Sequence, residues 1–179
     1  MQPSDLLRYA LWLAAAGVAR ANRRHYRMPT TWAPHLALNT AALLLPDVLR
    51  WLDRSPRQGA PGPVRAALEQ VVARNPGYVL CVAPFTAGYL ASHPRFDIYK
   101  GPLGALRLAG FGLDVLPHGA TALGLTLLAG DALAAADAAG GGRGRLGGAL
   151  RWCARRRALA TGAFIALLTL LWESGEWLA

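Results

Sequence analysis

Long apolar windows alternate with short polar, basic or Gly/Pro-rich stretches along the chain. The windows without charged residues run over 28–46, 75–94, 115–130 and 158–172. A helix needs about 20 mostly apolar residues to cross a bilayer core, so the two shorter windows, 115–130 and 158–172, become spans only when their flanks are included. The pattern predicts an all-α polytopic bundle in one transmembrane domain, 1–179, with four to five spans at about residues 4–20, 32–52, 76–92, 113–135 and 158–178.

The connecting stretches predict less regular structure. Residues 53–63 are rich in proline, glycine and charge and indicate a loop, whereas about 63–74 has apolar residues on one side and predicts a helix on the membrane surface. Prolines and glycines interrupt residues 93–112, which favours an interfacial or re-entrant segment, and 138–148 reads as a Gly/Arg loop. The first segment either spans or lies in the interface, and we expect it to be an uncleaved helix.

Composition supports the membrane interpretation and assigns a role to the positive charge. The 179 residues are 54% hydrophobic and 16% charged, with a net charge of +9. The basic residues fall between the apolar windows, which favours membrane topology over nucleic-acid binding. Twelve of the 19 Lys and Arg residues lie on the side of the N-terminus, so we expect this end in the cytoplasm, although the arginines within 20–27 argue the other way.

Two pairs of polar residues at the ends of apolar segments are the strongest candidate site. Asp114 and His118 are four apart, and Glu173 and Glu176 are three apart, so each pair shares one helical face. Carboxylates and imidazoles from facing helices can bind a divalent Mn, Fe or Zn ion. His93, Asp97 and His35 are outer candidates, because alternating spans place all four histidines of the chain at one membrane face.

Three functions remain open for this cluster. It could be a metal or cation site; it could be a structural hydrogen-bonded cluster in a non-catalytic subunit or assembly factor that docks a membrane-protein partner or a second copy; or it could serve a small transporter or proton pathway. The sequence contains no G-x-S-x-G, H-E-x-x-H or phosphate-loop motif, which favours a protein that is not an enzyme. Cys81 and Cys153 have no metal-ligand spacing.

The second half of the chain resembles the YjdF family of uncharacterised bacterial inner-membrane proteins. The resemblance rests on Phe111-Gly112-Leu113-Asp114, on His118-Gly119, on Trp172-Glu173-Ser174-Gly175-Glu176-Trp177 and on Gly101-Pro102-Leu103-Gly104. It covers about residues 97–178 and implies a multi-pass helical fold in the bacterial inner membrane. It implies no activity, and family members usually continue with an Asp/Trp-rich segment and a further span.

Overall fold

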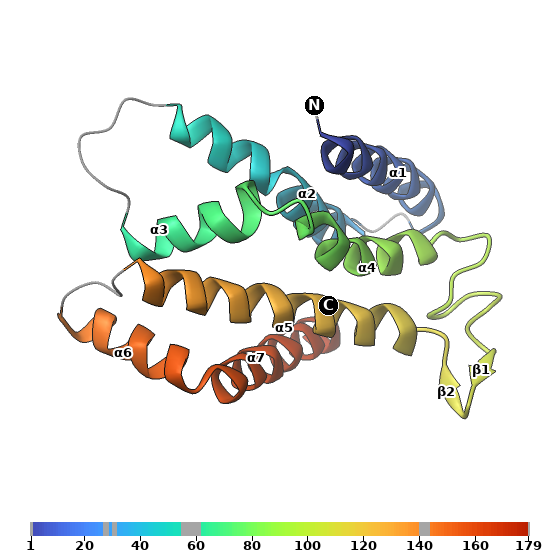
Figure 1. The fold of residues 1–179 in the computed structure, drawn as a ribbon. Coiled ribbons are helices and arrows are strands. Elements are labelled where there is room, and N and C mark those ends of the chain that lie inside the picture. The colour runs from blue at the N-terminus through green and yellow to red at the C-terminus, as the bar shows by residue number, and fades with distance from the viewer. Residues whose placement is uncertain (1, 27–28, 30–31, 55–61, 140–143, 179) are drawn as a thin grey trace. The chain divides into compact units, whose positions relative to one another are not determined.

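The chain is mostly helical, as the apolar pattern predicts (Figure 1). The computed structural model describes residues 2–26, 29, 32–54, 62–139 and 144–178, with the backbone alone at 144, 146, 172, 173 and 175–178. Its elements are α1 (Pro3–Tyr26), α2 (Ala33–Asp53), α3 (Pro63–Leu68), the π-helix η2 (Glu69–Ala73), α4 (Tyr78–Ala91), β1 (Arg107–Leu108), β2 (Phe111–Gly112), α5 (Val115–Ala138), α6 (Gly144–Arg155) and α7 (Arg157–Leu178).

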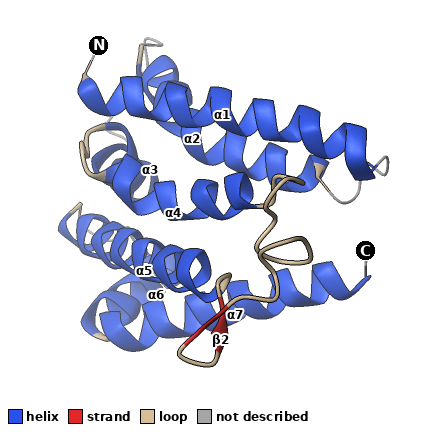
Figure 2. Ribbon diagram, turned by 90° about the vertical axis from the view of Figure 1, so that its right-hand side faces the viewer, coloured by secondary structure: helices blue, strands red, loops and turns tan. Residues whose placement is uncertain are grey.

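One stretch differs from the sequence interpretation. Much of the expected Gly/Arg loop lies in α6, because the glycines are outweighed by apolar residues at helical spacing, with arginines between them. A helix is present over the predicted residues 63–74, but its second half is the π-helix η2, and its place on a membrane surface stays a prediction. Residues 107–112 form a β-hairpin with a two-residue turn (Figure 2). The hairpin lies within 93–112, the stretch that prolines and glycines interrupt. Both residues of its turn, Ala109 and Gly110, have positive φ.

The chain divides into two compact units, which we describe separately. Unit 1 comprises residues 1–44 and 79–124, and unit 2 comprises residues 45–78 and 125–178. In unit 1, α1 packs against α2 through a hydrogen bond from Trp12 Nε1 to Thr40 Oγ1 of 3.2 Å. The small residues Ala15 and Ala19 of α1 form a buried cluster with Tyr89 of α4. These contacts make the three helices the core of unit 1.

A buried arginine serves the turn of α2 that contains Pro46. Proline has no N–H and removes one hydrogen bond from a helix interior. Arg8 donates to the Leu43 carbonyl in that turn, and its guanidinium also pairs with Asp5 at 2.9 Å. Arg8 is 2% exposed, so its charge is neutralised by Asp5 within the protein rather than by water.

Glycines allow α4 and α5 to approach closely in unit 1. A Cβ on Gly124 would lie 2.1 Å from the Cys81 carbonyl oxygen, and a Cβ on Gly88 would lie 3.2 Å from Pro117 Cβ. Pairing 81 with 124 and 88 with 117 requires antiparallel helices. The Cys81 carbonyl lies in the helical turn before Pro84 of α4. It is contacted by Gly124 of α5, just as the Leu43 carbonyl before Pro46 is contacted by Arg8.

In unit 2, hydrogen bonds and small residues hold the surface helix and the C-terminal helices. Arg50 of α2 donates to the Ala73 carbonyl at the end of η2, at 3.3 Å. Gly130 of α5 lies beside Arg157 and Thr161 of α7, because a Cβ there would be 3.6 Å from Arg157 Cδ. Thr161 bonds back to the Arg157 carbonyl at 2.8 Å, so its hydroxyl is satisfied within the helix.

Apolar side chains are exposed on several of these helices. Among the described residues, α5 is the one helix long and apolar enough to cross a membrane, and only 17% of its most apolar stretch is buried. The shorter helices Tyr78–Ala91 and Arg157–Leu171 are also apolar. Leu123 is 62% exposed and Leu170 is 65% exposed. Such surfaces are typical of helices that contact lipid or another protein.

We predict that Gly124→Ala destabilises the protein, whereas Gly119→Ala on the same helix does not. The methyl group at 124 would collide with backbone, which costs about 1–3 kcal/mol as overpacking. At 119 nothing lies within 4 Å of the new Cβ, and alanine favours the helix. Thermal unfolding of both variants in detergent, followed by circular dichroism, measures the difference. Equal midpoints would contradict the close α4–α5 approach.

Candidate functional site

Five of the seven candidate site residues can be located, and all five belong to unit 1. They are Asp114, His118, His93, Asp97 and His35. Glu173 and Glu176 lie near the end of α7 in unit 2, where the structure describes the backbone but not these side chains. Within the described part of the chain, no three His, Cys, Asp or Glu residues come together to hold a metal ion. The four-residue cation site therefore stays a prediction.

Asp97 organises the loop that follows α4. It is 4% exposed, and its Oδ2 accepts a hydrogen bond of 2.9 Å from the Tyr26 hydroxyl at the end of α1. Its Oδ1 accepts from the Tyr99 backbone N–H at 3.0 Å and from that of Lys100 at 3.4 Å. A Cβ on Gly101 would lie 2.4 Å from Asp97 Cβ, so the tight loop needs glycine there. Both carboxylate oxygens thus have donors within the protein.

Tyr26 remains a hydrogen-bond donor over a wide pH range. Partial burial, the hydrogen bond to Asp97 and the negative charge of that carboxylate together raise the pKa of Tyr26 to about 12. The His25 ring packs edge-on against the Tyr26 ring, with centroids 4.7 Å apart. The end of α1, a basic stretch in the sequence, is therefore tied to the loop after α4 by an acid and a phenol.

A second polar group joins the three helices beside this loop. The Asn22 amide donates to Ser92 Oγ at 3.1 Å, and Ser92 donates to the Tyr89 carbonyl at 2.7 Å. The Tyr89 hydroxyl donates to the Trp32 carbonyl at 3.4 Å, and the His35 ring stacks on Tyr89 with centroids 6.2 Å apart. His35 therefore lies at the polar end of the α1–α2–α4 core.

The other three candidates lie along the 92–114 stretch and the start of α5. His93 Nδ1 accepts from the Arg95 N–H at 3.2 Å. The exposed His118 ring is tilted against the Tyr99 ring at 5.9 Å, so Tyr99 connects the Asp97 turn to α5. A Cβ on Gly112 would lie 2.3 Å from Asp114 Oδ1, so this glycine makes room for the carboxylate. The backbone N–H of His118 bonds to the Asp114 carbonyl at 3.2 Å, which confirms their shared helical turn.

Some polar atoms of unit 1 are buried without a hydrogen-bond partner. Within the described residues they are Asn22 Oδ1, Trp32 Nε1, Asn39 Oδ1 and Thr86 Oγ1. Asn39 and Thr86 are both 0% exposed, the former one turn beyond His35 and the latter one turn before Tyr89. Because buried polar atoms normally have a hydrogen-bond partner, these atoms can accept or donate further hydrogen bonds in the α1–α2–α4 core. The arrangement can hold protons and polar groups.

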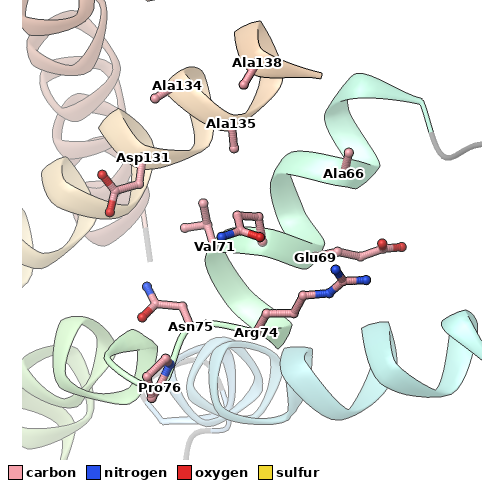
Figure 3. Close-up of a pocket in the computed structure, with 11 residues that line it drawn as sticks. Ala66, Glu69, Val71, Arg74, Asn75, Pro76, Asp131, Ala134, Ala135 and Ala138 are labelled. Atoms are coloured by element: carbon pink, nitrogen blue, oxygen red, sulfur yellow. The ribbon is translucent and has the colours of Figure 1, made fainter. Parts of the chain in front are cut away.

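A cavity in unit 2 was not foreseen from the sequence. It measures about 790 Å³ and lies between α3–η2 and the end of α5 (Figure 3). Glu69, Arg74, Asn75 and Asp131 bring polar groups to it. The available signal was Asp131, an acid inside the predicted span 113–135, where charge is costly unless it has a function.

In unit 1, the tyrosines at 26 and 99 were also missed, because hydroxyls give no periodic signal.

The comparisons with known protein families, with curated proteins and with solved structures found no match. The resemblance to the YjdF family therefore stays a prediction.

We predict that Tyr26→Phe lowers the free energy of unfolding by about 1–3 kcal/mol, the usual effect of removing a hydrogen bond to a charged group. The effect also depends on pH. The folded-state pKa of Tyr26 lies above the ordinary value of 10.0, so its contribution is complete below pH 10 and is lost as the pH rises through about 12.

Chemical denaturation at pH 8 and at alkaline pH measures this contribution, with Tyr9→Phe as the control on the same helix. The gap between wild type and Tyr26→Phe should narrow as the pH rises, whereas Tyr9→Phe should show no comparable pattern. A constant gap would show that the Tyr26–Asp97 bond does not depend on a protonated phenol.

Proposed function

We propose that the chain is a multi-pass protein of the bacterial inner membrane, with four or five spans and a cytoplasmic N-terminus. The observation that carries the proposal is α5, a 24-residue helix whose most apolar stretch is little buried by the rest of the chain. A soluble helix buries one apolar stripe, whereas an unburied helix that is apolar around its circumference needs lipid or a partner. Helices α1, α2, α4 and α7 would supply the remaining spans.

Three further features support a lipid environment. Both helix-interior prolines have a neighbouring group near the disturbed carbonyls, which is how membrane helices tolerate proline. The α4–α5 contact depends on glycine, as close helix pairs in membranes do. The hairpin residues Leu108 and Phe111 are 51% and 64% exposed, as expected of a segment that dips into the interface.

We assign the polar network around Asp97 to one end of the membrane-spanning core. Its described hydrogen bonds favour a structural and proton-holding role, because Asp97 already has three donors and the other described candidates are not grouped for a metal. The cation site of Asp114, His118, Glu173 and Glu176 is the extension of this proposal, supported by the spacing of the two pairs. A divalent metal ion would be its ligand.

A second candidate is a non-catalytic membrane subunit or assembly factor. The exposed apolar hairpin, with Leu108 at 51% and Phe111 at 64% exposure, favours it, since such side chains also suit a protein partner. Mutation of Phe111 to serine would separate the two uses. Loss of a co-purifying membrane protein would support docking, whereas unchanged partners with weaker lipid association would support insertion into the interface.

The topology proposal predicts opposite labelling of two exposed positions. If all five segments cross, Gly62→Cys should lie in the cytoplasm and Arg95→Cys on the outer side in a chain whose Cys81 and Cys153 are replaced by alanine. A membrane-impermeant maleimide added to spheroplasts should label Arg95→Cys at once and Gly62→Cys only after lysis. Labelling of both before lysis, or extraction of the chain by alkaline carbonate, would contradict the multi-pass arrangement.

Metal analysis tests the cation site separately. If Asp114, His118 and the two glutamates bind a divalent ion, purified wild type should contain close to one equivalent of metal, and the double variant Glu173→Gln, His118→Ala close to none. His25→Ala at the end of α1 provides a control, because His25 is not among the candidate ligands. Equally low metal in wild type and variant would end the metal proposal and leave the hydrogen-bonded network.

A further inference from the structure

The cavity of unit 2 has the size and wall chemistry of a ligand site. Its volume of about 790 Å³ falls in the range of small-molecule pockets. One wall is the last two turns of α5, where Ala134, Ala135 and Ala138 carry short side chains. The opposite wall is α3–η2, and Figure 3 shows Ala66 and Val71 on it. Small residues on both walls leave room that larger side chains would fill.

Two acids and one base line the cavity, and one of the acids is already paired. The paired acid is Glu69, which is 6% exposed and pairs with Arg65 one turn earlier. Arg65 bridges in turn to Asp53 at 3.3 Å, so this acid belongs to a local salt-bridge network. The remaining ionic groups are Arg74 at the end of η2 and Asp131 on α5, both exposed. The pocket thus offers opposite charges from its two walls.

The Asn75 amide adds a donor with a fixed direction. Its Oδ1 accepts a hydrogen bond of 2.8 Å from the Gly77 N–H, which closes a tight turn after η2. The amide nitrogen is therefore turned the other way, and Figure 3 shows it on the side of the cavity where Asp131 lies. Arg74 extends along η2 toward Glu69. A ligand that satisfies both walls needs an ammonium for Asp131 and an anion for Arg74, while the Asn75 amide lies on the Asp131 side.

The π-helix explains how these groups come to one cavity. The Arg74 N–H bonds to the Glu69 carbonyl at 3.0 Å, five residues back rather than four. This wider turn changes which residues of the amphipathic helix share a face, and π-turns frequently occur at functional sites. Arg50 holds the end of the turn through the Ala73 carbonyl, so the backbone before Arg74 is anchored. A regular helix would give the sequence 66–74 a different set of lining residues.

We propose that this cavity binds the zwitterionic phosphoethanolamine group of a membrane lipid, with its ammonium on Asp131 and its phosphate on Arg74. The lipid source rests on the proposed membrane location. The amphipathic α3 supports it, because Val64 is 50% exposed and Leu68 is 38% exposed, which gives acyl chains an apolar surface on the same helix as the cavity wall. Arginine donors suit phosphate oxygens, and a carboxylate suits a primary ammonium.

The experiment measures binding of short-chain phosphatidylethanolamine to the full chain in detergent by native mass spectrometry. The pocket variants are Asp131→Asn and Arg74→Gln. Their matched controls are Asp137→Asn on the same helix and Arg54→Gln after α2, neither of which lines the cavity. Each pocket variant should bind about tenfold more weakly, the factor expected for one lost charge-assisted hydrogen bond, and the controls should bind like wild type.

Two further probes define the ligand. Phosphatidylglycerol of the same chain length has the phosphate but no ammonium, so it should bind wild type more weakly and should not weaken further with Asp131→Asn. Water-soluble phosphoethanolamine should bind more weakly than the lipid, and equal affinity would overturn the lipid source. Equal phosphatidylethanolamine binding by wild type and both pocket variants would overturn the site. Alkaline carbonate extraction of the same variants tests the membrane proposal separately. A chain that is not embedded in the membrane is released by carbonate, whereas a membrane protein without the lipid site is not.

Discussion

Polar groups inside apolar helices must find partners within the chain, and this constraint shapes both compact units. Arg8 is almost fully buried, and it is tolerated because Asp5 neutralises it and the Leu43 carbonyl accepts from it. Asp97 is buried to a similar degree and is held by Tyr26 and two backbone N–H groups. Each of these residues would be costly in isolation, so each fixes the elements that supply its partners.

The same constraint locates the functional chemistry at helix ends and turns. In unit 1, the loop after α4 gathers Asp97 and Tyr99 next to the end of α1 and the start of α5. In unit 2, the π-turn and the Asx turn at Asn75 present donors beside an acid of α5. The apolar helices provide the scaffold, and the irregular backbone between them provides directed polar groups, as in many membrane proteins.

The sequence predicts the helices well and the site only in part. Apolar windows of helical length locate α2, α4, α5 and α7, because a long apolar run with few breaks favours a continuous helix. The helix α6 was missed, since its glycines suggested a loop while its amphipathic spacing decides the structure. The Tyr26–Asp97 hydrogen bond joins residues that are 71 positions apart, and no local sequence pattern predicts such a distant partner. The cavity depends on a π-turn, which periodicity at 3.6 residues does not reveal.

The central claim is that α5 lies in lipid with apolar side chains around its circumference. Spin labels at Leu116→Cys, Leu123→Cys and Leu127→Cys in reconstituted bilayers test it directly, because these exposed positions lie at different depths along the helix. The account predicts that collisions with oxygen exceed those with a water-soluble nickel complex at Leu123 and Leu127, and less so at Leu116. Higher nickel than oxygen accessibility at Leu123 would place the helix in water and contradict the account.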